Sequence, residues 1–100
     1  DQSVYEKIFE SVKQVDGASN PHRIRVRKLA NMYVIGIDIE VDPELKVGQA
    51  HAIAQALEQK LKDNLGNVYD ILVHVEPWGN LEKDEKYGLS TRDFLNNQTK

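Results

Sequence analysis

The apolar residues of this chain repeat with the period of a helix in two segments and with the period of a strand in three. Residues 2–16 and 47–64 carry them at spacings of three and four, which predicts two amphipathic helices. Residues 22–28, 32–41 and 68–76 alternate apolar and polar positions, which predicts three half-buried strands. The predicted order is therefore helix, strand, strand, helix, strand.

The lengths of the connections predict how these strands pair. A turn at Ala30 and Asn31 joins the first two strands, so we expect an antiparallel hairpin. The third strand follows a helix, which favours a parallel pairing with the second strand and a right-handed crossover. A three-stranded mixed sheet with two helices on one face buries every apolar stripe, giving a two-layer α+β domain. We expect the other face to be wet, and Val34 and Leu72 on it suggest a partner.

Three arginines in the strictly alternating segment 22–28 fall on one face of the first strand. Such a row can bind phosphate or a nucleic-acid backbone. The favoured interpretation is cross-strand pairing with acids of the same sheet face, such as Asp38 and Glu40, at about 0.2–1 kcal/mol per pair. The formal net charge of −3 and the pI near 5.6 also argue against nucleic acid as a partner. The row consists of Arg23, Arg25 and Arg27.

Composition limits the remaining choices. The 100 residues, 40% of them apolar and 29% charged, suffice for one compact domain. No apolar run is long enough to cross a bilayer, and no secretory signal is present. The absence of cysteine excludes a disulfide framework and a thiolate site, so nitrogen and oxygen must hold any metal. No nucleophile–base arrangement or glycine-rich phosphate loop is evident, so we do not expect an enzyme.

The composition changes near residue 79. The segment NLEKDEK at 80–86 has almost no apolar content and cannot repay the entropy of ordering. We therefore predict a domain at 1–78 and a flexible polar tail at 79–100, whose only anchors are Tyr87, Leu89, Phe94 and Leu95. Docking of the tail would use Phe94 and Leu95.

Three histidines and two carboxylates are the candidate metal ligands. His74 and Glu76 are two apart in a strand, so they share a face and can converge on one ion. Asp38 projects from the sheet face opposite the core, His22 opens the first strand, and His51 flanks the apolar stripe of the second helix. Spacing alone does not bring the histidines together, and solvated bystanders remain the alternative.

Four short segments, in the order HRIRVR, IEVDP, QAH and VHVEP, resemble the cytosolic C-terminal domain of cation diffusion facilitator transporters. The resemblance covers about residues 3–78. It implies an αββαβ metallochaperone-like (ferredoxin-like) domain on the cytoplasmic side of a six-helix membrane transporter, paired in a V-shaped homodimer. It also implies metal binding near the dimer interface by His22, Asp38, His51, His74 and Glu76.

Two of these positions depart from some zinc-transporting members of the family. Asp38 stands where some members have a histidine, and Glu76 stands where an aspartate also occurs. Both favour oxygen donors, so Fe(II), Mn(II) and Co(II) join Zn(II) as candidate ions. Several magnetosome-associated iron transporters of this family also carry a polar C-terminal tail, so membership of that subfamily is a further alternative.

The resulting hypothesis is a regulatory cytosolic domain of a divalent cation efflux transporter. Binding of Zn, Fe or Mn would close the V-shaped homodimer and activate transport by the transmembrane domain of the same protein. Two alternatives remain: a dimerisation module that needs no metal, and a small-molecule-binding or RNA-binding α+β module that uses the arginine row.

Overall fold

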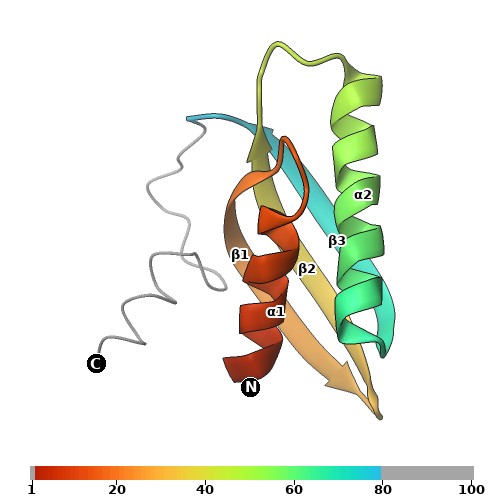
Figure 1. The fold of residues 1–100 in the computed structure, drawn as a ribbon. Coiled ribbons are helices and arrows are strands. Elements are labelled where there is room, and N and C mark those ends of the chain that lie inside the picture. The colour runs from red at the N-terminus through yellow and green to blue at the C-terminus, as the bar shows by residue number, and fades with distance from the viewer. Residues whose placement is uncertain (1, 80–100) are drawn as a thin grey trace, which may run out of the picture.

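The computed structural model describes residues 2–79, with helices on one side of a single sheet. The sheet order is β1-β2-β3, with β2 antiparallel to β1 and parallel to β3. Both helices cover the same face (Figure 1), so the predicted two-layer αββαβ fold is confirmed. Neither described helix has the length and apolar character needed to cross a membrane. The elements are α1 (Gln2–Lys13), β1 (Ser19–Leu29), β2 (Met32–Val41), α2 (Val47–Leu65) and β3 (Val68–Pro77). Except for Gly79, the predicted tail lies outside the described residues.

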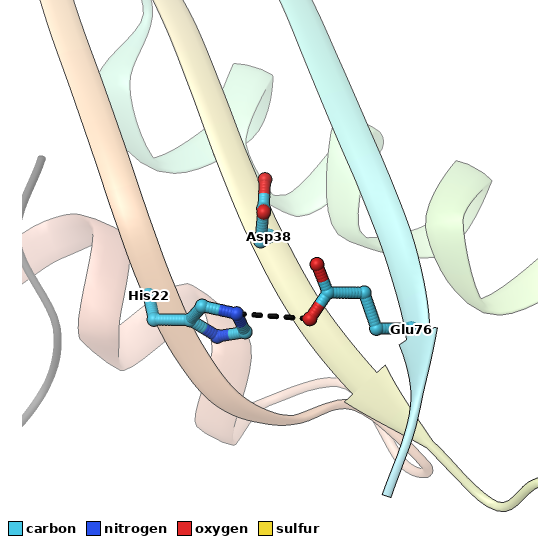
Figure 2. Close-up of side chains that lie close together, drawn as sticks. All are labelled: His22, Asp38 and Glu76. Atoms are coloured by element: carbon cyan, nitrogen blue, oxygen red, sulfur yellow. Dashed lines mark hydrogen bonds and ion pairs between the residues drawn. The ribbon is translucent and has the colours of Figure 1, made fainter. Parts of the chain in front are cut away.

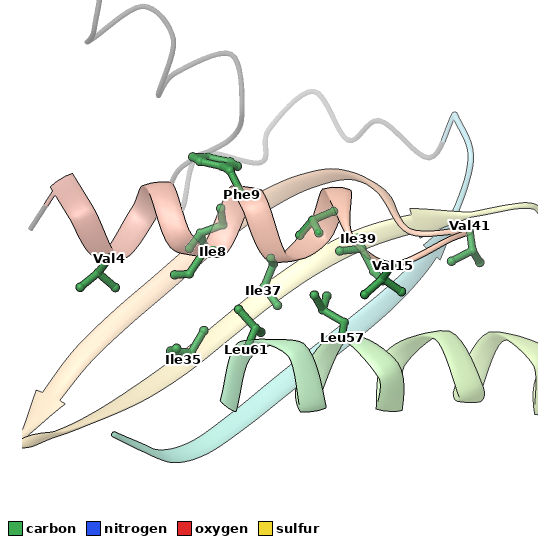
Figure 3. Packing of buried hydrophobic residues seen from close by; sticks show 12 residues of the cluster. Val4, Ile8, Phe9, Val15, Ile35, Ile37, Ile39, Val41, Leu57 and Leu61 are labelled. Carbon is green, nitrogen blue, oxygen red and sulfur yellow. The ribbon is translucent and has the colours of Figure 1, made fainter. Parts of the chain in front are cut away.

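The core lies between the two helices and the covered face of the sheet (Figure 3). Alternate residues of β2 point toward the helices, and Ile35, Ile37 and Ile39 are at most 1% exposed. Ile8 of α1 and Leu57 of α2 pack against this row and are fully buried. Each such side chain contributes about 1.5–3 kcal/mol on burial, so the helix–sheet interface accounts for most of the fold's stability.

Helix α1 ends at Lys13, three residues earlier than its apolar pattern predicts. The amide of Val15 donates to the carbonyl of Val12 at 3.1 Å, and the amide of Ala18 donates to that of Val15 at 3.2 Å. These tight turns replace the last helical turn but keep the Val15 side chain in the core. The apolar spacing that predicted the helix therefore extends to Val15, two residues beyond the last helical residue.

Strand β1 begins at Ser19, three residues before the predicted start at 22, and it departs from the strict alternation predicted for 22–28. Ser19 pairs with Glu40, His22 with Asp38, and Arg25 with Gly36, so β1 holds one extra residue in each interval. Asn20 and Arg23, one in each interval, have positive φ values of 45° and 48°. These are β-bulges, and each one shifts the alternation of side chains by one position. As a result, His22 shares a face with Arg25.

Strand β3 contains a similar irregularity at its start. Tyr33 pairs with Val68 and Val34 with Asp70, which leaves Tyr69 as an extra residue. The pattern predicts that Tyr69 faces the core, but its side chain is 65% exposed. The later inward positions of β3, including Ile71 and Val73, pack against the core as predicted.

Two matched leucine substitutions test this description of the core. We expect Leu57→Ala to lower the free energy of unfolding by about 2–5 kcal/mol, because it leaves a cavity at a fully buried site. Leu29→Ala at the exposed tip of the hairpin should cost less than about 1 kcal/mol. Urea denaturation of both variants measures the difference. Equal losses would contradict the assignment of the core to the helix–sheet interface.

Candidate metal centre

The sheet face away from the helices carries a buried cluster of three side chains, one from each strand (Figure 2). His22 comes from β1, Asp38 from β2 and Glu76 from β3, and they are 8%, 1% and 6% exposed. One nitrogen or oxygen atom of each residue lies within 4.8 Å of the others. Three adjacent strands thus converge on one small polar site.

Strand register explains why these residues meet. Asp38 is the cross-strand partner of His22 on one side and of His74 on the other. Glu76 follows His74 on the same face of β3. The bulge at Arg23 turns His22 toward this face, which a regular strand with Arg25 on it would not do.

The prediction that this face is wet is wrong around Asp38. The short aspartate side chain stands on the central strand and is covered by longer neighbours, chiefly Arg23, Arg25 and Glu76. Glu40 on the same face is also buried, and it accepts a hydrogen bond from Asn20 Nδ2 at 3.0 Å. The carboxylates of Asp38, Glu40 and Glu76 on this face are therefore desolvated rather than solvated.

The two ring nitrogens of His22 face two acceptors. Nδ1 lies 2.8 Å from the carbonyl oxygen of Asn20, and Nε2 lies 3.0 Å from Oε1 of Glu76. A neutral imidazole has one N–H, and the carbonyl oxygen can only accept a hydrogen bond, so Nδ1 carries that hydrogen. The contact between Nε2 and Oε1 then needs a second proton or a cation. A histidine whose Nδ1–H is fixed by a backbone carbonyl is oriented to bind a metal through Nε2.

Asp38 is surrounded by positive groups but makes no hydrogen bond through its side chain. Both carboxylate oxygens are buried without a hydrogen-bond partner. Arg23 Nε and Arg25 Nη1 each lie 3.6 Å away, and His74 Nδ1 lies 3.5 Å away. Leaving such oxygens unbonded costs about 1–3 kcal/mol. A divalent ion bound at about 2.0–2.2 Å would satisfy them, so the donor set fits a metal.

The predicted pairing of the arginine row with Asp38 is confirmed for two of its three members. Arg23 and Arg25 direct their guanidinium groups at the carboxylate. Arg27, whose cross-strand partner is Val34, lies farther along the strand and is exposed. A polyanion would therefore meet one exposed arginine of the row and two that already face the carboxylate of Asp38.

The remaining two predicted ligands lie in different places. His74 stands at the rim of the cluster, with its side chain 59% exposed and Nδ1 3.4 Å from Oε2 of Glu76. His51 is exposed on α2, on the other side of the sheet. One chain thus brings four of the five predicted residues together. The ligand role of His51 stays a prediction that needs a second copy of the chain.

Burial raises the pKa of Glu76, and the nearby negative charge of Asp38 raises it further. The ion pair and hydrogen bond with His22 act in the opposite direction but do not cancel these effects. The ionised carboxylate is therefore destabilised in the metal-free fold. A cation between these groups would relieve that cost.

Comparison with known proteins links this geometry to metal transport. A family model described as "Cation efflux protein, cytoplasmic domain" matches residues 1–78. The metal-bound C-terminal domain of the CzcD transporter from Thermotoga maritima is 34% identical, with a TM-score of 0.76 over 80% of this chain and 93% of that one. The cytosolic domain of a cation diffusion facilitator family protein is 33% identical, with a TM-score of 0.73 over 78% of this chain and 93% of that one.

Curated relatives are much longer than this chain. Metal tolerance protein 2 of Oryza sativa is 32% identical over 75 residues, which are 75% of this chain and 19% of the rice protein. The manganese efflux system protein MneP of Bacillus subtilis is 27% identical over 82 residues, covering 78% of this chain and 28% of that protein. The chain therefore covers only 19% and 28% of the length of these two relatives.

The raised pKa of Glu76 predicts how the metal-free stability depends on pH. The folded state takes up this proton before the unfolded chain does, so acidification favours the folded state. As the pH falls from 7 toward about 4.3, the wild type should gain stability relative to Glu76→Gln. Urea denaturation with a chelator present measures this difference, and Glu10→Gln on the exposed side of α1 is the control. Parallel profiles for the wild type and Glu76→Gln would contradict the assignment.

Proposed function

Because this chain belongs to the cation efflux protein family, whose cytoplasmic domain it matches over residues 1–78, we propose that it is the metal-sensing domain of a divalent cation exporter. The observation that carries this proposal is the buried cluster of His22, Asp38 and Glu76, with its unbonded Asp38 oxygens. The similar domain from Thermotoga maritima is described as metal-bound, which supports the same chemistry here. The family is one of transporters rather than enzymes.

Four side chains of one copy would hold the ion. His22 offers Nε2, His74 offers Nδ1, and Asp38 and Glu76 offer carboxylate oxygens. Nitrogen and oxygen donors suit Zn(II), and also Fe(II), Mn(II) and Co(II). When bound, the ion supplies positive charge that two desolvated carboxylates lack. The imidazoles must be neutral and the carboxylates ionised to bind the ion, so binding should weaken as the pH falls.

We propose further that two copies of the domain pair and that His51 acts across the pair. His51 is remote from the cluster of its own chain, so its imidazole can serve that cluster only from a second copy. Leu72 and Trp78 are exposed apolar side chains near the cluster that a self-complementary contact would cover. Binding by both copies would draw the two domains together and narrow a V-shaped dimer. The transmembrane part of the same protein would respond to that closure.

The size of the effect suits a sensor. An ion at about 100 times its dissociation constant stabilises the binding form by roughly 2.7 kcal/mol if the other form does not bind. That free energy shifts a two-state ratio by about 100-fold, which is short of the roughly 10⁴-fold needed for complete reversal. A graded response is the expected behaviour.

Calorimetric titration with Zn(II), Mn(II) and Fe(II) tests the ligand set. We expect Asp38→Asn to weaken binding at least about 10-fold, because the central carboxylate lies within 4.8 Å of ligand atoms of both His22 and Glu76 and 3.5 Å from Nδ1 of His74. Asp70→Asn is the matched control, since Asp70 is exposed on β3 opposite Val34. Equal affinity of Asp38→Asn and the wild type would contradict the site.

Small-angle scattering of the dimer tests the role of His51. We expect the wild type to become more compact when it is saturated with Zn(II). His51→Ala should still bind Zn(II) at the four-residue cluster but should compact less, because its cross-chain ligand is lost. Identical compaction of this variant and the wild type would exclude His51 as a bridging residue.

A further inference from the structure

The side chain of Arg25 crosses the sheet over Gly36 to reach Asp38. Gly36 is the cross-strand partner of Arg25. A Cβ atom on Gly36 would lie 2.6 Å from Nη2 and 2.8 Å from Nε of Arg25. The guanidinium therefore occupies the space that a side chain at position 36 would fill. The missing side chain of Gly36 leaves the path from Arg25 to Asp38 open.

Two further contacts hold the guanidinium in this position. Nη1 donates a hydrogen bond to the carbonyl of Arg23, in the second bulge of β1. The same nitrogen lies 3.6 Å from Oδ1 of Asp38, beyond hydrogen-bond length. Arg25 thus neutralises the buried carboxylate by charge alone and leaves the oxygen free to accept a ligand.

We propose that Arg25 is a built-in counter-cation of the metal site, which lowers its affinity for divalent ions and so sets the concentration at which they bind. This inference rests on the proposed function, because it assumes that Asp38 is a metal ligand. Arginine stays charged at every physiological pH, so its positive charge opposes an incoming cation at all times. The carboxylate of Asp38 therefore cannot bind the ion and keep its full attraction to Arg25 at the same time.

Arg25 is better suited to this role than its neighbour Arg23. The Arg23 backbone is fixed in a bulge with positive φ, and the Arg23 atom that faces Asp38, Nε, is buried. Both arginine side chains are about a third exposed, but Arg25 faces Asp38 through Nη1, at the free end of its side chain. Its guanidinium therefore has a route to water when an ion takes its place, and its charge regains solvation there.

Arg25→Gln removes the charge and keeps a polar side chain. We expect this variant to bind Zn(II) at least about 10-fold more tightly than the wild type, because one opposing charge is gone. With a chelator present, its melting temperature should be lower than that of the wild type, because Asp38 has lost a counter-charge. Arg27→Gln, on an exposed arginine of the same strand, should match the wild type in both measurements.

Gly36→Ala gives a second, independent variant that keeps the arginine. Its added methyl group must displace the flexible end of Arg25, and no positive φ opposes alanine at this position. We expect tighter Zn(II) binding than in the wild type, with a smaller gain than in Arg25→Gln. This variant keeps the proposal testable if Arg25→Gln does not fold.

Calorimetry separates failure of this inference from failure of the proposed function. If the wild type binds Zn(II) and the folded Arg25→Gln and Gly36→Ala variants bind it equally or more weakly, the counter-cation role is overturned and the metal site stands. If the wild type binds no Zn(II), Mn(II) or Fe(II), the proposed function is overturned and this inference with it.

Discussion

A buried carboxylate at the centre of a sheet needs positive charge close by, and Asp38 imposes that requirement on the open face of this domain. Its side chain is 1% exposed and has no hydrogen-bond partner. Burying such a charge unpaired would cost several kcal/mol. Arg23, Arg25 and His74 are arranged around it from both neighbouring strands. The same requirement favours a divalent ion at this position. The negative charge of Asp38 is balanced by arginine and histidine side chains in the metal-free fold, and a bound ion would balance it in the proposed metal site.

Backbone irregularity, rather than the regular pleat, builds this arrangement. Without the bulge at Arg23, a β1 strand with Arg25 facing Asp38 would turn His22 toward the helices. The bulge also directs the Arg23 carbonyl to Arg25 Nη1. One extra residue in an edge strand thus delivers both a histidine nitrogen and a positioned guanidinium to the central carboxylate. Edge strands tolerate such insertions because only one neighbour must adjust to them.

Local periodicity predicted the elements, the hairpin and the parallel third strand, because each depends on residues close together in sequence or on a short connection. The grouping of His74 and Glu76 followed from the same alternation. Periodicity did not predict the bulges in β1 and at Tyr69, because strand pairing decides which residue is left over. Asn20, a residue type that adopts positive φ readily, was the only local hint. The burial of Asp38 was missed because it depends on long side chains from two other strands.

The separation of the two sheet faces means that an ion bound beside Asp38 would act on a face that does not form the hydrophobic core. Ile35, Ile37 and Ile39 of β2 form the core with the helices, while Asp38 projects from the same strand to the opposite face. The hydrophobic core therefore does not depend on a metal, in contrast to small domains that fold only when an ion is bound. In the metal-free state Nε2 of His22 lies 3.0 Å from Oε1 of Glu76, and Arg25 balances Asp38. An arriving ion would have to replace both, so its binding free energy would be spent on rearranging one face of an already folded sheet.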